Sequence, residues 1–232
     1  SDVPLGTHLS GGLDSSAIAC LAARQLNAPL QVFTGGFKDS ARYDESAYAR
    51  LVAGELGAVY HEVFPRAADL ASTFQKLIYY LDEPIAGAAV FPQYFLSELA
   101  SRHVKVVLGG QGGDEIFCGY ARYLVAYLEG CLQQAIYGQG EDSVAEGLSL
   151  GDLSAGLSYL RGYEPMMMKY FGQDLFGDPA ARYYLLLRRP SQDLEGVLEG
   201  DWQEEGYSTR EVFRAEFMAP RTGALIDRML YM

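Results

Sequence analysis

Strand patterns and helix patterns alternate through the N-terminal half of the chain, and this alternation restricts the possible folds more than any other feature. Four short apolar or alternating runs read as strands, at residues 6–9, 30–34, 59–63 and 104–108. Helix patterns lie between them, at residues 15–26, 44–56, 67–81 and 92–102. Strands joined through helices are parallel, so we predict an α/β fold with a doubly wound parallel sheet. Residues 104–108 are apolar except Lys105, which is typical of a buried strand.

The pattern changes near Tyr120. Strand-like runs become rare, and helical stretches take over at residues 123–137, 152–161, 180–188 and 209–217. We therefore predict an α/β core at residues 1–120 and a helical subdomain at residues 121–232. The last helical pattern stops at Met232 without a cap or glycine, so we expect a subdomain that is incomplete at its C-terminal end. An apolar face would then be uncovered, and we expect disorder around residues 138–151 or a compensating crystal contact.

Composition excludes several classes of function. The formal net charge of −12 disfavours nucleic acid as a partner, because phosphate contacts need clustered Lys and Arg. No apolar run approaches the roughly 18 residues of a membrane helix. The 3 cysteines and 3 histidines lack metal-type spacing, so a zinc site is not expected. These features favour a reduced, cytoplasmic protein, with Cys20 as a small core residue.

The first candidate site is the loop Ser10–Ser16, which lies between a predicted strand and a predicted helix. Its glycines, Gly11 and Gly12, allow backbone N–H groups to approach an anion, and the positive end of the helix dipole favours phosphate there. Asp14 would repel a bare phosphate, which indicates a bridging divalent cation. The alternative is a plain turn with a helix cap. The flanking strand and helix favour the phosphate-binding interpretation.

A second glycine-rich, acidic loop follows the strand predicted at residues 104–108. It reads Gly109-Gly110-Gln111-Gly112-Gly113-Asp114-Glu115, then Phe117, Gly119 and Tyr120. Two acidic loops at the carboxyl edge of one sheet suit a magnesium–nucleotide site. We therefore expect the carboxylates of Asp14 and Asp114 to lie roughly 4–6 Å apart, within reach of one ion.

These motifs carry a resemblance to known families. Residues 10–16 resemble the pyrophosphate loop of the N-type ATP pyrophosphatases, which have an adenine-nucleotide alpha-hydrolase-like fold. Residues 109–123 resemble the signature of glutamine-hydrolysing asparagine synthetases. The same resemblance includes shorter motifs spread over residues 2–123, which are Tyr43-Asp44-Glu45, Tyr60-His61-Glu62, residues 81–86 and residues 92–97.

The resemblance implies a two-step reaction that uses ATP and Mg²⁺. A carboxylate, aspartate in that family, attacks the α-phosphorus of ATP to give an acyl-adenylate and pyrophosphate, and ammonia then displaces AMP. It implies that Asp14 and Asp114 bind the metal. It further implies pyrophosphate contacts from the loop, at Ser10, Gly11, Gly12, Ser15 and Ser16, and backbone contacts with adenosine from Leu9, Gly35, Gly109 and Gly110.

One position departs from the family. Gln111 stands where a carboxylate is common, and an amide cannot act as a general base. Glu115 or water would then handle the proton, or the acceptor is not aspartate. A β-lactam synthetase-like enzyme and a nucleotide-binding module without synthesis therefore remain alternatives. His61 is interpreted as a structural histidine more readily than as a site residue, and Asp82 and Glu83 either shape a pocket or end a helix.

The resemblance also implies segments outside the printed residues. We expect an N-terminal glutaminase domain that supplies ammonia from glutamine, and a lysine-bearing segment after residue 232 that completes the site. The chain as given is accordingly expected to bind ATP weakly and to make no amide, since one lost charge-stabilising group costs about 10²–10³ in rate.

Overall fold

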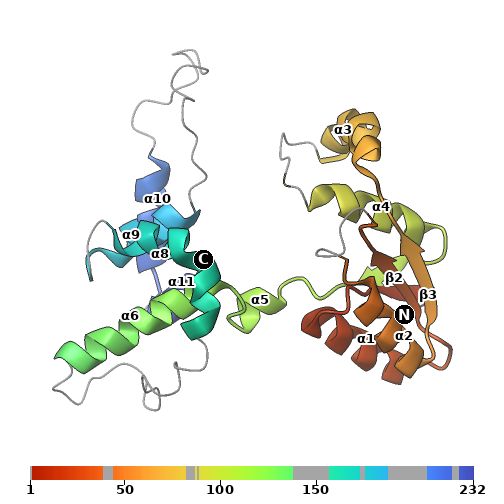
Figure 1. Cartoon of the computed structure of the whole chain (residues 1–232), viewed down its shortest axis with the longest axis horizontal. Coiled ribbons are helices and arrows are strands. Elements are labelled where there is room, and N and C mark those ends of the chain that lie inside the picture. Colours follow the sequence, from red (N-terminus) through yellow and green to blue (C-terminus); the bar gives the residue numbers. More distant parts are fainter. Residues whose placement is uncertain are drawn as a thin grey trace. The chain divides into compact units, whose positions relative to one another are not determined.

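The computed structural model describes residues 2–38, 44–81, 87, 89–137, 157–172, 176–187, 208–220 and 225–232. The chain forms two compact units, residues 1–113 (the first unit) and residues 114–232 (the second unit) (Figure 1). Tyr120, near which we predicted a domain boundary, lies within the second unit. The residues predicted to be disordered, 138–151, lie outside the described part of the chain.

The first unit is built on a parallel sheet. Its strands are β1 (Leu5–His8), β2 (Gln31–Gly35), β3 (Val59–Val63) and β4 (Val106–Leu108), in the order β3-β2-β1-β4. Gly6 of β1 pairs with Gln31 on one side and Val107 on the other. The predicted α/β fold with a parallel sheet is confirmed. Because all four strands run the same way, the loops after β1, β2 and β4 leave the sheet at one edge.

Helices cover both faces of this sheet. Helices α1 (Leu13–Gln25) and α2 (Ser46–Leu56) pack on one face, and α4 (Val90–Ser101) packs on the other, with α3 (Ala67–Leu81) against α4. The buried faces of α1 and α2 consist of small residues, which are Ser15, Ala19, Ala22, Ser46, Ala49 and Ala53. Small side chains let the helix axes approach the strands closely.

Burial in the first unit differs in two places from what the sequence pattern suggests. Leu21 and Leu51 recur with other residues at helical spacing in α1 and α2, yet they are 58% and 64% exposed, because the smaller alanines occupy the sheet-facing positions. In β4, Val106 and Leu108 are each 38% exposed. Among the described residues β4 pairs only with β1, so it is an edge strand rather than the buried strand that its apolar sequence suggested.

The second unit is helical in its described residues. After α5 (Gly113–Ile116), which begins at the unit boundary, come the elements α6 (Ala121–Tyr137), η1 (Leu157–Tyr163), α8 (Glu164–Phe171), α9 (Pro179–Leu187), α10 (Thr209–Met218) and α11 (Leu225–Tyr231). Helices were predicted for most of α6, α9 and α10, and the structure confirms them. Helix α8 was not predicted. Within the described residues, every helix is too short or too polar to span a bilayer.

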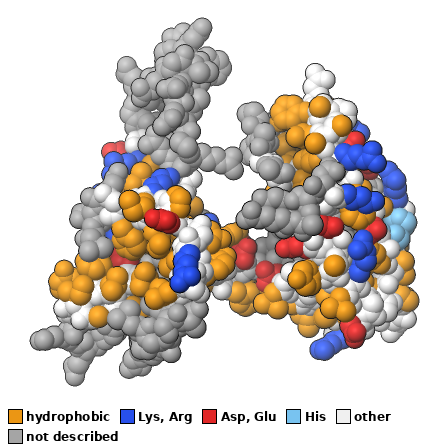
Figure 2. Space-filling model, in the orientation of Figure 1, with side chains coloured by type: hydrophobic (Ala, Val, Ile, Leu, Met, Phe, Trp, Pro, Cys, Tyr) orange, Lys and Arg blue, Asp and Glu red, His pale blue; other side chains and the backbone are white. Residues whose placement is uncertain are grey.

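Aromatic side chains and one ion pair hold the second unit together. Tyr183 and Phe217 pack in the main cluster, and Tyr170 packs in a second one. The Arg182 guanidinium pairs with the Glu129 carboxylate, and their side chains are only 3% and 1% exposed. Arg182 also lies 4.9 Å from the Tyr170 ring centroid. Burial, more than any other cause, raises the pKa of the Tyr170 hydroxyl. Apolar side chains cover much of the visible face of this unit (Figure 2).

Candidate functional site

The loop Ser10–Ser16 connects β1 to α1 and is fixed by its own serines. Ser10 and Ser15 share a hydrogen bond between their hydroxyls at 2.9 Å. The Ser15 hydroxyl also accepts from the backbone N–H of Ser10 at 3.2 Å, and the Gly12 N–H donates to the Ser10 hydroxyl at 3.2 Å. Helix α1 begins directly after Gly12. Since glycine has no side chain, the start of the helix has no side-chain cap. Backbone N–H groups at the start of α1 thus remain available to an anion.

Gly11 is required by both conformation and space. Its φ of +87° lies in the left-handed region, which favours glycine. A Cβ at this position would lie 2.6 Å from Tyr48 Cβ and 2.7 Å from the backbone nitrogen of Ala49, at the start of α2. The tight turn between β1 and α1 therefore depends on the absence of a side chain here.

The second glycine-rich segment, residues 109–113, lies directly against the first loop. A Cβ at Gly110 would lie 2.6 Å from the backbone nitrogen of Ser15, and one at Gly113 would lie 2.5 Å from Asp14 Cγ. Both segments belong to the first unit and follow the neighbouring strands β1 and β4. The predicted meeting of these two loops at one edge of the sheet is therefore confirmed within residues 1–113.

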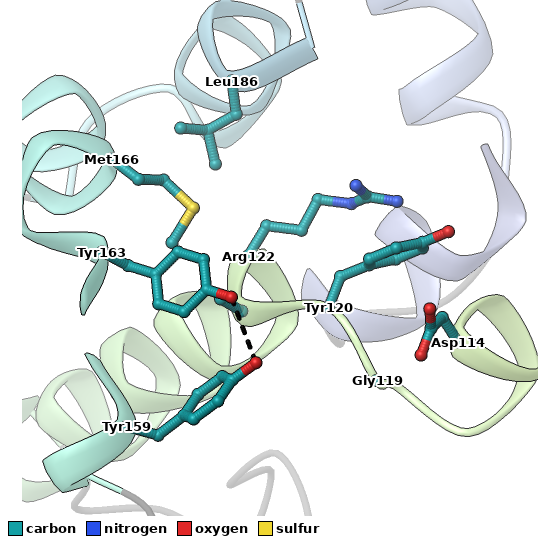
Figure 3. Close-up of a pocket in the computed structure, with 9 residues that line it drawn as sticks. Asp114, Gly119, Tyr120, Arg122, Tyr159, Tyr163, Met166 and Leu186 are labelled. Carbon is teal, nitrogen blue, oxygen red and sulfur yellow. Dashed lines mark hydrogen bonds between the residues drawn. The ribbon is translucent and has the colours of Figure 1, made fainter. Parts of the chain in front are cut away.

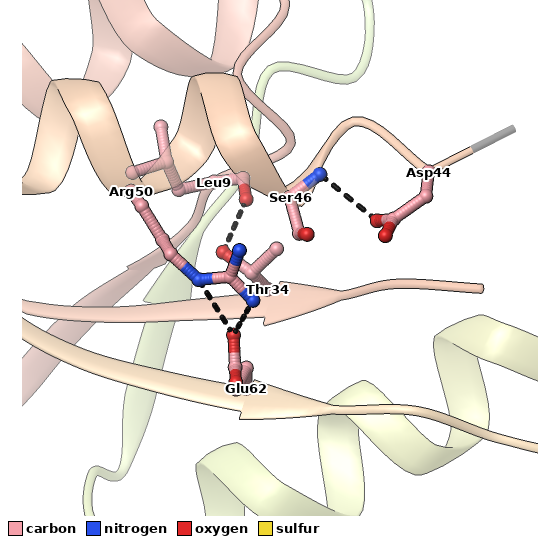
Figure 4. A network of polar contacts seen from close by, with 6 residues as sticks. All are labelled: Leu9, Thr34, Asp44, Ser46, Arg50 and Glu62. Carbon is pink, nitrogen blue, oxygen red and sulfur yellow. Dashed lines mark hydrogen bonds and ion pairs between the residues drawn. The ribbon is translucent and has the colours of Figure 1, made fainter. Parts of the chain in front are cut away.

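Residues of β2 anchor the start of the first loop. The backbone N–H of Leu9 donates to the Phe33 carbonyl at 2.9 Å, and the Leu9 carbonyl accepts from the Thr34 hydroxyl at 2.7 Å. Thr34 is buried, at 1% exposure. Nearby, Arg50 donates twice to one Glu62 oxygen, at 2.6 and 3.1 Å (Figure 4). Leu9 therefore enters the loop in one fixed orientation.

The residues around the two loops fit a nucleotide. A Cβ at Gly35 would meet nothing within 4 Å, and one at Gly109 only the Gln111 nitrogen at 4.0 Å, so open space lies beside both backbones. The Ser16 hydroxyl is buried and has no hydrogen-bond partner in the described structure, which suits a further polar ligand. Together with the uncapped start of α1, these features match a phosphate-bearing ligand.

A metal ion would use the carboxylates of Asp14 and Asp114. Asp14 belongs to the first unit and Asp114 to the second, so the predicted distance between their carboxylates stays a prediction. Within the described residues, no group of three or more His, Cys, Asp or Glu side chains could hold an ion by itself. A site of two carboxylates completed by phosphate oxygens would still suit Mg²⁺, which commonly binds through one or two carboxylates and substrate phosphates.

Asp114 and Glu115 open the second unit and have different surroundings. A Cβ at Gly119 would collide with Asp114 Oδ1, so this glycine makes room for the carboxylate. The Tyr120 hydroxyl donates to Glu115 Oε1 at 2.6 Å, and this hydrogen bond is the main cause that lowers the pKa of the Glu115 carboxyl. Gln111, in the first unit, is exposed.

Asp114 also lines a pocket of about 390 Å³ within the second unit. Figure 3 shows Asp114, Tyr120 and Arg122 on one side and Tyr159, Tyr163, Met166 and Leu186 on the other. The Tyr159 and Tyr163 hydroxyls are hydrogen-bonded at 3.1 Å. The Arg122 guanidinium stacks on the Tyr120 ring, 3.9 Å from its centroid. Sequence reasoning missed this pocket because its two sides are far apart along the chain.

Other motif residues have structural roles or are not described. His61 Nε2 lies 2.7 Å from Gln31 Oε1, and its ring packs on Phe33 and His103. It is thus a hydrogen-bonded, stacked histidine. Asp44 Oδ1 accepts from the Ser46 N–H at 3.1 Å, at the start of α2, and this hydrogen bond is the main cause that lowers the pKa of Asp44. Tyr43, Asp82 and Glu83 lie outside the described residues, and Cys20 is only partly buried.

Comparison with known proteins agrees with this geometry. The asparagine synthase family profile matches residues 1–232. The chain belongs to the asparagine synthase family. Its sheet, with the site loops at the carboxyl edge, is accordingly of the adenine-nucleotide alpha-hydrolase type.

Three relatives illustrate the breadth of the asparagine synthase family. A putative glutamine-hydrolyzing asparagine synthetase of Mycobacterium bovis is 42% identical over 123 residues, which are 53% of this chain and 19% of the relative. A glutamine-hydrolyzing asparagine synthetase of Bacillus subtilis is 36% identical over 123 residues, again 53% and 19%. The amidase chyE of Penicillium rubens is 32% identical over 134 residues, 52% of this chain and 20% of the relative. The chain therefore spans about a fifth of the length of these relatives.

Proposed function

We propose that this chain is part of an ATP-dependent carbon–nitrogen ligase that forms an amide through an acyl-adenylate. The acceptor carboxylate is aspartate, as the names of the asparagine synthetases among its relatives suggest, or another carboxylic acid. One observation carries the proposal. The segment 109–113 packs against Asp14 and Ser15 at the carboxyl edge of the sheet, so two family motifs form one continuous surface in the first unit.

In the first step the chain holds the pyrophosphate end of ATP. The backbone of Gly11 and Gly12, the hydroxyls of the loop serines and the N-terminus of α1 would neutralise the leaving group, whose charge grows in the transition state. The unpartnered Ser16 hydroxyl supports this role. Asp14 and Asp114 would hold Mg²⁺, and the bound ion would supply positive charge to the phosphates.

The adenosine end of ATP would lie beside backbone rather than side chains. Leu9 follows β1, Gly35 ends β2, and Gly109 and Gly110 follow β4. The open space next to Gly35 and Gly109 supports main-chain contacts there. The Thr34 hydroxyl keeps the Leu9 carbonyl oriented for this purpose. Fixing the nucleotide at both ends aligns the α-phosphorus with the attacking carboxylate, which supplies much of the rate enhancement.

In the second step ammonia attacks the acyl carbon, the bond to AMP breaks, and a proton leaves the nitrogen. Gln111 can orient the ammonia but cannot take the proton. Glu115 can take it as an ionised carboxylate that the Tyr120 hydroxyl holds in place, although the same hydrogen bond lowers its pKa and makes it a weaker base. We propose Gln111 and Glu115 as the residues nearest to this proton transfer.

Ammonia would come from glutamine through a glutaminase domain elsewhere in the complete protein, as the relatives' description "glutamine-hydrolyzing" suggests. The remaining partners are small molecules, and a cytoplasmic location suits these substrates. Since the chain spans about a fifth of these relatives, residues 1–232 alone are expected to bind ATP weakly and to form no amide.

Exchange of labelled pyrophosphate into ATP tests the first step. The complete protein, with Mg²⁺ and a panel of carboxylic acids, should show exchange that depends on one class of acid. Asp14→Asn and Asp114→Asn should each abolish it, whereas Glu55→Gln, at an exposed position of α2, should leave it unchanged. Absence of exchange with every acid, despite ATP binding, would identify a nucleotide-binding module without synthesis.

An acceptor other than aspartate is a second candidate, as in β-lactam synthetase-like enzymes. Two observations favour it. Gln111 replaces the carboxylate that is common in asparagine synthetases, and one of the relatives is named an amidase. Analysis of the amide product by mass spectrometry distinguishes the two candidates.

A further inference from the structure

The pocket in the second unit has two chemically different sides. One side consists of the motif residues Asp114, Tyr120 and Arg122, and the other consists of Tyr159, Tyr163, Met166 and Leu186 from η1, α8 and α9. The volume of about 390 Å³ is in the range of small-molecule sites. The pocket therefore joins the charged and polar side chains of the motif to an aromatic and apolar surface.

If the proposed function holds, Asp114 places this pocket next to the reacting phosphorus. A metal ligand lies about 2.1 Å from Mg²⁺, and the ion contacts the phosphates. The molecule in the pocket would then be the one that attacks the α-phosphorus, which is the acceptor carboxylic acid. Figure 3 shows the Tyr159 and Tyr163 hydroxyls directed toward each other in the lining of this pocket, where they can also contact the acceptor.

The charges around the pocket decide which acceptor it suits. Arg122 is the cation among its lining residues, and its guanidinium is stacked on Tyr120 and directed to Tyr123, at 3.9 and 5.0 Å from the two ring centroids. Its Nη2 donates to the Tyr123 hydroxyl at 3.5 Å. The Arg122 Nε is buried without a hydrogen-bond partner in the described structure, so it can pair with the one reacting carboxylate of an acceptor. The second carboxylate of aspartate would then lie toward Met166 and Leu186, which cannot pair with a charge.

We propose that this pocket binds the acceptor and favours a carboxylic acid with an uncharged, apolar or aromatic body over aspartate. The inference rests on the proposed function, because it needs Asp114 to lie at the site of adenylation. The reacting carboxylate oxygen forms a bond to the α-phosphorus while the bond to pyrophosphate breaks. The uncharged remainder of the acid packs between Tyr163, Met166 and Leu186.

Pyrophosphate exchange in the complete protein, with 3-phenylpropanoate or L-aspartate as the acid, tests the inference. Both probes present one reacting carboxylate and differ in the body attached to it. We expect kcat/KM for exchange to be at least about 10-fold higher with 3-phenylpropanoate, since apolar contacts of this kind discriminate by 10-fold or more.

A charge change in the wall should reverse this preference. Met166→Lys places an ammonium group in the half-buried wall, where it can pair with the second carboxylate of aspartate. We expect the ratio of the two kcat/KM values to move toward aspartate by about 10-fold or more. Met168→Lys is the matched control, because Met168 lies on the same helix and is 68% exposed, and should leave the ratio unchanged.

Each outcome decides between the two proposals. A wild-type preference for aspartate, or a Met166→Lys ratio that equals the Met168→Lys ratio, would overturn the pocket assignment and leave the ligase function standing. Exchange with neither probe nor any other acid would overturn the ligase function, and the pocket assignment with it. Because the wild-type preference is itself decisive, the test does not depend on the folding of Met166→Lys.

Discussion

The two units of this chain bury polar side chains in different ways. Among the described residues of the first unit, those buried are small and neutral, and they are Thr7, Ser15, Thr34 and Ser46. In the second unit they are the charged residues Glu129 and Arg182. The backbone hydrogen bonds of a sheet join one strand to the next, so a few hydroxyls suffice to fix the loops at its edge. Helices form their backbone hydrogen bonds internally and none with one another. In the second unit an ion pair and stacked rings therefore specify how the helices pack.

Because of this difference, substitutions of buried polar residues should have different consequences in the two units. The first unit concentrates its polar contacts around the Ser10–Ser16 loop, so a defect should appear in ligand binding before it appears in folding. The second unit depends on a pair whose separation would leave a buried charge without a partner, so a defect there should appear as lost stability.

The largest effect is expected from Arg182→Ala. It leaves the Glu129 carboxylate buried at 1% exposure, which should destabilise the second unit by about 3–5 kcal/mol. Hydrogen exchange should accelerate in α6 and α9 and stay unchanged in β1 and β2. Arg214→Ala is the control, since its pair with Asp178 is 63% and 34% exposed and should contribute less than about 1 kcal/mol. Equal effects of the two substitutions would contradict the contrast between the units.

A smaller and local effect is expected from Thr34→Val. The Leu9 carbonyl would lose its donor, at a cost of about 1–3 kcal/mol. The affinity of the complete protein for ATP should fall, as measured by calorimetry, while hydrogen exchange in the second unit stays unchanged. Thr34→Ser should restore binding, and Thr73→Val, on α3, should have no effect on it. Unchanged ATP affinity in Thr34→Val would show that the hydrogen bond from the Thr34 hydroxyl to the Leu9 carbonyl is not needed for nucleotide binding.

The smallest expected effect is a loss of stability at low pH, which should be confined to the first unit because the histidines lie there. All three histidines, His8, His61 and His103, lie in the first unit. Burial lowers the pKa of His8, and burial and His103 lower the pKa of His61. The unfolded chain then binds more protons below about pH 6.5, so the first unit should lose stability as the pH falls through that value toward the folded-state pKa.

Hydrogen exchange at about pH 7 and pH 5.5, corrected for its intrinsic rates, measures this loss. The opening free energy of β1–β3 should fall, and His61→Gln should reduce the fall. The α6 and α9 amides, in a unit without histidine, provide the internal reference. A fall of the same size in both units would attribute the effect to carboxylates instead.

Sequence reasoning succeeded where a pattern was local. The strands of the first unit and the two glycine-rich loops follow from apolar runs and from turn and phosphate-loop chemistry, which depend on neighbouring residues. Helical spacing alone did not indicate burial. Leu21 and Leu51 recur at helical spacing, but alanines on adjacent faces pack more closely against the sheet.

The second unit was harder to predict for the same reason. Helix α8 has Pro165 in its first turn and a run of methionines, which gives no clear amphipathic period. The pocket joins Tyr120 to Leu186, and the Glu129–Arg182 pair spans a similar stretch of chain. Only packing brings such residues together, so no spacing in one sequence reveals them.

The contact between Gly113 and Asp14 limits how this chain can change over generations. A side chain at position 113 would occupy the space of the Asp14 carboxyl group. A larger residue at position 113 therefore requires the Asp14 carboxyl group to rotate away or to be shortened, and either change removes the carboxylate from its present place. The two positions are far apart in the gene but depend on each other. Selection that keeps the Asp14 carboxylate in place also keeps glycine at position 113.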